Sequence, residues 1–186
     1  MKRLTNNKTA LSNVVSTLII LVVSVLLAGV VSMYAVNITS TRTQQEALKL
    51  SKQEIWVYGN GTAYAALVID NVGGRDVLID KIQIRGVEAS WSNVYYIRRS
   101  SSISTSLNCP DATPTWTNFE YTSGLTATFT NDTNDKPLAS GDTMILYIRN
   151  PESVSVSDIG VTIGITVFTE NAQYYVECNV KSAESA

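Results

Sequence analysis

The stretch from Thr9 to Val36 contains no charged residue and lies close to the amino terminus. Its most apolar part, from Val14 to Val36, is about as long as the roughly 20 residues that an α-helix needs to cross a hydrocarbon core of about 30 Å. A helix of this composition loses too much free energy in water, at about 0.8 kcal/mol for each exposed CH₂ group. It must therefore lie in lipid or in a packed protein core.

Charges on either side of this stretch predict its orientation in a membrane. Lys2, Arg3 and Lys8 precede it, and Arg42 is the first charge after it. Positively charged flanks stay on the cytoplasmic side of a membrane. The short basic head is therefore expected in the cytoplasm, and the chain beyond Val36 is expected outside it.

Three interpretations of the stretch compete. A secretory signal peptide has an apolar region of about 7 to 15 residues before its cleavage site, so this stretch is too long for one. A plain signal anchor, which would hold a binding module at the cell surface, fits both the length and the charge asymmetry. A class III leader also fits, because it is cleaved before the apolar run and leaves that run in the mature protein.

Residues around position 10 have the features of a class III leader. The basic head ends in the small residues Thr9 and Ala10, and "LSNVV" leads directly into the apolar run. This start resembles that of archaeal type IV pilins, in which Leu-Ser-Pro-Val-Ile is typical, with an asparagine here in place of proline. The resemblance implies that a prepilin peptidase cleaves between Ala10 and Leu11, or alternatively between Thr9 and Ala10. Bacterial pilins carry a glutamate near the mature start, where this chain has Val15 or, for the alternative cut, Val14.

The resemblance also implies how the chain is used. A membrane platform and a cytoplasmic ATPase would assemble it from the cytoplasmic membrane into an extracellular filament, an adhesive pilus of which it is the major structural subunit. An archaellin, the subunit of a rotating archaeal filament, is the nearest alternative, and a membrane-anchored β-sandwich binding module is another. The helix residues expected to form the core of the homopolymer are Val14, Val15, Leu18, Ile19, Leu21, Val22, Val25, Leu26, Val30, Met33 and Tyr34.

The sequence predicts three segments. Residues 1–10 form the cleaved leader, and residues 11–54 form one helix that crosses the membrane before assembly and lies in the filament core afterwards. The last part of this helix, residues 43–54, is rich in helix formers and is predicted to project as a stalk until the breakers "GNG". Residues 55–186 form a head domain.

The head has the pattern of an all-β domain. "KIQIR" alternates polar and apolar residues, and "GVTIGITVF" places Val161, Ile163, Ile165 and Val167 on one face. Glycine and asparagine at 71–76 predict a turn between two strands. The predicted fold class is α+β, with a long N-terminal hydrophobic helix before an immunoglobulin-like sandwich, and a small barrel is the alternative. This head is also similar in pattern to the β-sandwich heads of archaeal pilins and archaellins.

Cys109 and Cys178 are the only cysteines, and both are expected outside the cytoplasm, where a disulfide persists. Cys178 is expected on the core face of the last strand, and Cys109 lies in a loop before a proline. We predict that they pair and tie that loop to the last strand, which would stabilise the head by about 2 to 4 kcal/mol. Two unpaired structural thiols are the alternative.

The segment from Ser100 to Thr133 is rich in Ser and Thr and is predicted to be the most exposed part of the head. Its composition predicts a polar loop, and the family resemblance implies O-linked sugar or adhesive contact there. Sequons at Asn37, Asn60 and Asn131 are candidates for N-linked glycans, each near an expected boundary or turn. A fourth sequon begins in the leader and would be removed with it.

Composition excludes several classes of function. The absence of histidine removes the usual acid–base catalyst and most metal sites, so we expect no enzyme, no metal and no cofactor other than covalent glycans. The acidic "NDTNDK" (131–136) lacks the glycine and distal glutamate of a Ca²⁺ loop, which favours a simple turn over a Ca²⁺ site. Charged residues are only 16% of the chain and the net charge is −2, so no nucleic-acid partner is expected.

Overall fold

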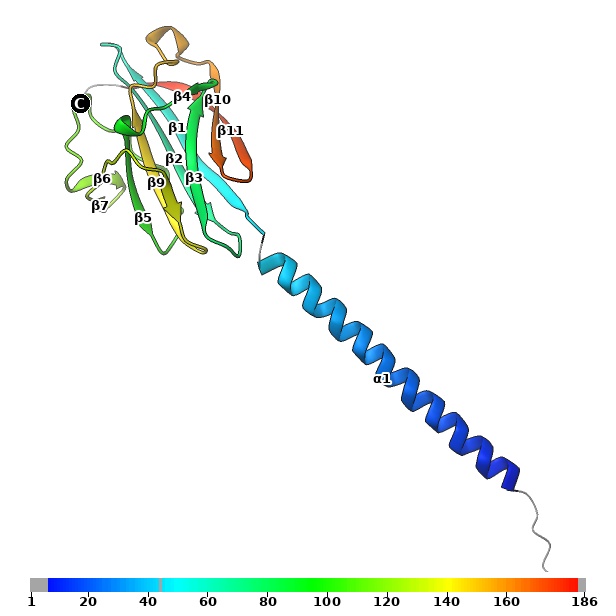
Figure 1. The fold of residues 1–186 in the computed structure, drawn as a ribbon. Coiled ribbons are helices and arrows are strands. Elements are labelled where there is room, and N and C mark those ends of the chain that lie inside the picture. Colours follow the sequence, from blue (N-terminus) through cyan, green and yellow to red (C-terminus); the bar gives the residue numbers. More distant parts are fainter. Residues whose placement is uncertain (1–6, 44, 184–186) are drawn as a thin grey trace, which may run out of the picture. The chain divides into compact units, whose positions relative to one another are not determined.

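The computed structural model describes residues 7–43 and 45–183, and the chain divides into two compact units after Thr43. The first unit contains a single helix, α1 (Asn7–Thr43), and the second is an all-β head (Figure 1). The predicted α+β class, a long apolar helix followed by a β-sandwich, is confirmed. The first six residues of the predicted leader lie outside the described residues.

The described part of the head contains eleven strands and two short 3₁₀ turns. The turns are η1 (Trp91–Asn93) and η2 (Val156–Asp158). In chain order the strands are β1 (Leu48–Tyr58), β2 (Ala63–Asn71), β3 (Val77–Ile84), β4 (Val87–Glu88), β5 (Val94–Arg99), β6 (Phe119–Thr122), β7 (Leu125–Ala127), β8 (Lys136–Leu138), β9 (Thr143–Arg149), β10 (Thr162–Thr169) and β11 (Gln173–Ala183).

One continuous sheet forms the sandwich. Its strand order is β4-β3-β10-β11-β1-β2-β9-β5, β8 pairs with β3, and β6 and β7 form a separate ribbon. The first strand, β1, pairs antiparallel with β2 and parallel with the last strand, β11. Ile84 of β3, Ile165 of β10 and Leu146 of β9 belong to one buried cluster, so the two halves of the sheet face each other across it. The two layers are therefore halves of one sheet.

This inner core is mainly aliphatic. Ile163, Ile165 and Val167 of β10 point into it, as their alternation with small and polar residues predicts. Branched aliphatic side chains suit this position because they pack well on a pleated, half-buried surface. The prediction is wrong for Val161, which precedes β10 and is 42% exposed. The turn expected at 71–76 is confirmed between β2 and β3.

A second, aromatic core lies on the outer face of the sheet. Residues 100–133, the cover segment, lie over β2, β9 and β1 and bury Leu107, Tyr121 and Phe129 against them. Most residues of this segment are exposed, as predicted, but it is not a free polar loop, because these three side chains are buried against the sheet. Its apolar residues are few and widely spaced, but they reach the sheet while many of the intervening Ser and Thr residues stay at the surface.

The predicted stalk is also wrong, because α1 ends at Thr43 and residues 48–54 belong to β1. Leu48–Ser51 and Glu54 pair with β2, and from Ile55 onward β1 also pairs with β11. The side chains of Ile55 and Val57, which continue the strand, are completely buried. Helix propensity is worth only tenths of a kcal/mol per residue, so pairing and burial outweigh it. The helix predicted over 11–54 therefore ends at Thr43, and the last residues of the predicted range are in β1 instead.

The chain enters the sheet through Gln45–Ala47, which packs against the turn between β2 and β3. The backbone N–H of Gly73 donates to the Ala47 carbonyl at 3.0 Å. A Cβ on Gly73 would lie 2.6 Å from the Ala47 nitrogen, so only glycine allows this approach. Beside it, the Glu46 carboxylate accepts hydrogen bonds from the Thr169 hydroxyl and the Tyr174 hydroxyl at the β10–β11 hairpin.

Candidate functional site

Helix α1 is apolar on every side. Between Leu11 and Thr41 it has the length and composition to cross a membrane, and none of its described side chains is buried within the chain. Leu26, for example, is 64% exposed. The residues predicted to form a filament core are all exposed in the single subunit, namely Val14, Val15, Leu18, Ile19, Leu21, Val22, Val25, Leu26, Val30, Met33 and Tyr34.

Several hydroxyl groups along α1 donate to carbonyl groups of the helix itself. Thr17 Oγ1 donates to the Asn13 carbonyl at 3.0 Å, and Thr41 Oγ1 donates to the Asn37 carbonyl at 2.9 Å. Ser24 Oγ donates to the carbonyl one turn before it. Hydroxyls bonded in this way present little unpaired polarity, so they suit lipid and a packed helical core equally well.

The predicted cleavage site falls near the beginning of α1. The bond between Ala10 and Leu11, and the alternative bond between Thr9 and Ala10, both lie within helical backbone. The side chains of Thr9 and Ala10 lie outside the described ones, whereas that of Leu11 is exposed. Cleavage at either bond would leave almost the whole apolar helix on the mature chain. The cleavage site itself remains a prediction from the sequence.

The three candidate glycosylation residues differ in the freedom of their amide nitrogens. Asn131 Nδ2 donates to the carbonyls of Ser92 and Val94 at 2.8 and 2.9 Å, so a glycan on that nitrogen would displace these bonds. Asn60 is exposed in the β1–β2 turn, and its Oδ1 accepts the Thr62 N–H at 2.9 Å while Nδ2 faces no such constraint among the described residues. Asn37 lies within α1. Asn60 is thus the residue best placed for modification.

The predicted disulfide is wrong, because Cys109 and Cys178 are both free thiols. Cys178 packs against the inner core, on the expected face of β11, whereas Cys109 packs against the aromatic core on the other face of the sheet. The sheet therefore separates the two sulfur atoms. Burial raises the pKa of Cys178 to about 11 and also raises the pKa of Cys109, so both are protonated near neutral pH.

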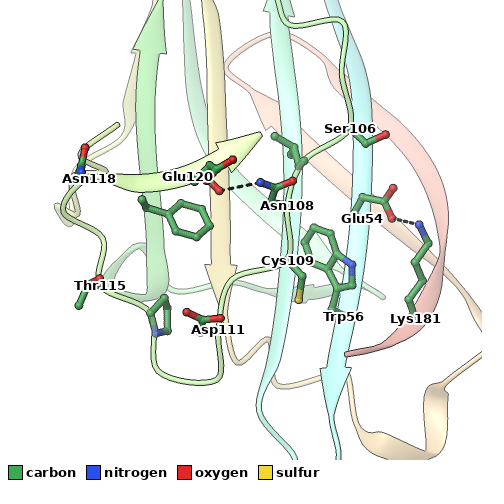
Figure 2. A pocket seen from close by; sticks show the side chains of 13 residues that line it. Glu54, Trp56, Ser106, Asn108, Cys109, Asp111, Thr115, Asn118, Glu120 and Lys181 are labelled. Carbon is green, nitrogen blue, oxygen red and sulfur yellow. Dashed lines mark hydrogen bonds and ion pairs between the residues drawn. The ribbon is translucent and has the colours of Figure 1, made fainter. Parts of the chain in front are cut away.

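A cleft opens where the cover segment meets the outer faces of β1 and β11. It has a volume of about 740 Å³, and Figure 2 shows the side chains that line it. Trp56 of β1 and Phe119 of β6 provide apolar surface. Around them lie acidic, amide and hydroxyl groups, and Lys181 of β11 forms an ion pair with Glu54 of β1 at 2.5 Å.

Tyrosine hydroxyls from the outer face of the sheet hold the wall of this cleft in place. Tyr147 donates to the Asn108 carbonyl at 3.0 Å, and Tyr58 donates to the Pro110 carbonyl. Burial raises the pKa of both Tyr147 and Tyr58, so they remain protonated donors at neutral pH. The loop after Asn108 is therefore fixed to the sheet by directed hydrogen bonds as well as by ring packing.

The acidic motif at 131–136 contains its own cation. The Lys136 ammonium is almost completely buried, bonds the Asp132 carboxylate and lies 4.6 and 5.0 Å from the ring centres of Trp91 and Tyr96. Tyr96 also donates to Asp132 at 2.5 Å. Hydrogen bonds from Lys136 and Tyr96 lower the pKa of Asp132 to about 2. This motif is a structural ion pair that closes the end of the cover segment.

Sequence reasoning missed the cleft, because it treated the cover segment as a polar loop. A signal was present in the aromatic residues that interrupt the Ser and Thr pattern. Trp116, Phe119 and Phe129 form one packed group with Tyr147, with the ring centres of Trp116 and Phe119 5.4 Å apart. Aromatic side chains bury large areas, so several in a polar segment indicate a docked cover.

Comparisons with known proteins give no family for this chain. No family model matches it, and no curated protein matches it. Among solved structures, a "Copper-bound PCuAC domain from PmoF2" is similar over 75% of this chain and 100% of that one, at 11% identity and a TM-score of 0.34. A likeness this weak carries no argument about fold or function.

Proposed function

We propose that this chain is the major subunit of an archaeal type IV adhesive pilus and that it polymerises through α1. The observation that carries the proposal is the helix from Leu11 to Thr41, which is apolar on all sides and buries none of its described side chains within the chain. At about 1.5 to 3 kcal/mol for each large apolar side chain, its exposure to water would exceed the stability of an ordinary domain. Such a helix needs lipid or copies of itself.

The order of segments supports a filament over other uses of the same helix. A short basic head and a small-residue junction at Ala10 and Leu11 precede the apolar run, as in a class III leader. Gly29 lies within α1 and has no side chain, and small residues of this kind let helices approach closely. A prepilin peptidase would trim the chain, and a membrane platform with its ATPase would move the helix from lipid into the filament.

The test is a pair of substitutions at the junction, expressed in the native host. We expect Ala10→Arg to block cleavage, so that uncut precursor stays in the membrane and filaments are lost. Ala10→Ser, the matched control, keeps a small residue and retains both cleavage and filaments.

Intact mass and negative-stain microscopy of sheared surface material provide the readouts. Cleavage of Ala10→Arg at the same bond as wild type would contradict the leader assignment. A wild-type chain that is never cleaved, and that stays in membranes, would favour the anchored binding module. Filaments that rotate would identify an archaellin.

A further inference from the structure

We propose that the cleft between β1, β11 and the cover segment is a binding site for a neutral saccharide. The site would provide the attachment that an adhesive pilus requires, and in that respect it rests on the proposed function. The binding event itself needs only the folded head. It can therefore be tested whether or not the chain polymerises.

The cleft has the size of a ligand site. Its volume of about 740 Å³ falls within the range of roughly 300 to 1,000 Å³ that small-molecule sites occupy. In Figure 2 the side chains of Glu120 and Asn108 lie above it, Asp111 lies below, and Glu54 and Lys181 lie at one side. The ligand would thus meet groups from three directions.

The cleft combines apolar and polar walls in the way a sugar ring requires. Trp56 and Phe119 contribute aromatic surface to the lining. The electron-rich face of an aromatic ring attracts polarised hydrogens, which the C–H groups of a pyranose carry. The hydroxyl groups on the edge of the same ring need hydrogen-bonding partners, and the remaining walls contain them.

Several polar atoms in the cleft have unused hydrogen-bonding capacity. Asn108 uses its Nδ2 on the Glu120 carbonyl at 3.1 Å, which leaves its Oδ1. Glu120 Oε1 accepts the Gly124 N–H at 2.9 Å, which leaves Oε2. Asp111 lines the cleft and makes no hydrogen bond or ion pair within the part of the chain that the structure describes. Carboxylate and amide oxygens accept from hydroxyls, and Lys181 can donate to them.

The charge distribution selects among ligand classes. Three carboxylates, those of Glu54, Asp111 and Glu120, line the cleft with one ammonium, so anionic sugars and phosphates are disfavoured. Among the described residues no three acidic, Cys or His side chains converge to hold a metal ion. Acceptors that are dispersed around an apolar wall suit a ligand with hydroxyls at many positions.

The wall of the cleft is preorganised. Tyr147 fixes the Asn108 carbonyl, and the Asn108 N–H donates to the Tyr121 carbonyl at 2.8 Å. Fixing groups before binding reduces the entropy lost when a ligand is held. The cleft is thus built into the fold of the cover segment.

The experiment uses the full chain as single subunits in detergent, applied to an array of neutral oligosaccharides built from glucose, galactose, mannose and N-acetylglucosamine. A sialylated oligosaccharide and oligolysine are included. We expect one or more neutral members to bind and the sialylated one not to bind. For the best binder, Asp111→Ala and Glu120→Gln should each weaken affinity at least tenfold by calorimetry. Glu170→Gln, which removes an exposed carboxylate from the β10–β11 hairpin, should leave affinity unchanged.

A second readout locates the ligand. Cys109 lines the cleft, whereas Cys178 packs against the inner core on the other face of the sheet. A bound saccharide should slow alkylation of Cys109 at mildly alkaline pH and leave that of Cys178 unchanged. The proposal is overturned if no neutral saccharide binds, if oligolysine binds in its place, or if the two cleft variants bind as wild type. Near-UV circular dichroism checks that the variants keep the aromatic core.

Discussion

The helix and the head both contain many leucine, isoleucine and valine residues, but most of those in the head are buried in its core, whereas those on the helix are exposed. In the head, Ile55, Ile165 and Leu146 are essentially completely buried, and two cores use both faces of one sheet. In α1, leucine, isoleucine and valine residues are exposed over the whole described length. The head satisfies its apolar surface within one chain, whereas the helix needs a partner outside it. Stability and assembly should therefore respond to different substitutions.

The largest effect is expected from a charge in the helix. We predict that Leu26→Asp abolishes filaments and reduces membrane insertion, since a charged residue at the centre of a membrane helix costs about 2.5 to 3.5 kcal/mol. The denaturation midpoint of the head should not change. Leu26→Ile is the matched control and should assemble. If Leu26→Asp unfolded the head, the separation between the two units would be wrong.

The complementary substitution removes a ring from the aromatic core. Phe129 is buried, with ring centres of Tyr147 and Phe119 at 5.3 and 5.7 Å. We predict that Phe129→Ala lowers the free energy of unfolding of the head by about 3 to 5 kcal/mol. Chemical denaturation followed by tryptophan fluorescence measures this change.

Limited proteolysis of Phe129→Ala shows which part of the head becomes accessible to a protease. Cleavage should increase first within residues 100–133, because that segment loses one of its anchors. Phe129→Leu keeps most of the volume and should be milder. An unaltered midpoint for Phe129→Ala would show that the cover segment does not depend on the aromatic core.

A smaller effect is expected where the chain enters the sheet. A Cβ at Gly73 would lie 2.6 and 2.7 Å from backbone atoms of Ala47 and Gln45, and a backbone cannot move away as a flexible side chain can. We predict that Gly73→Ala destabilises the head by about 1 to 3 kcal/mol, as overpacking does. Gly59→Ala, where no atom lies within 4 Å, is the control. Thermal melts of both variants decide the comparison.

The smallest effect concerns pH. The pKa of Asp132 is about 2 in the folded head, below the roughly 3.9 of an unperturbed aspartate, because Lys136 and Tyr96 bond its ionised form. Its contribution to stability is therefore present above about pH 4 and is lost as the pH falls toward 2. We predict that Asp132→Asn lowers the urea midpoint at pH 6 and that this difference shrinks at pH 2. Asp135→Asn, an exposed neighbour, should show neither effect.

Periodicity predicted those parts of the fold in which local pattern and tertiary environment agree. The alternation of Ile163, Ile165 and Val167 marked a strand with one buried face, and the turn at 71–76 followed from its glycines. The helix was predicted from length and composition alone. In each case the residues near in sequence determine the structure, so the sequence is informative.

The errors arose where distant partners decide the structure. Residues 48–54 have acceptable helix propensity, but pairing with β2 makes them part of a strand. The cover segment has no period, and its aromatic residues become meaningful only when the outer face of the sheet is known. Both cysteines belong to the head, but they lie on opposite faces of the sheet. Their spacing in the sequence does not reveal this separation.

The most direct test of the proposed pilus is the mass and amino-terminal peptide of the protein recovered from sheared cell-surface material. We predict a mature chain that begins at Leu11, or at Ala10 for the alternative cut, in a fraction that sediments as filaments. Recovery from membranes alone, with Met1 still attached, would contradict this prediction and leave a tethered β-sandwich.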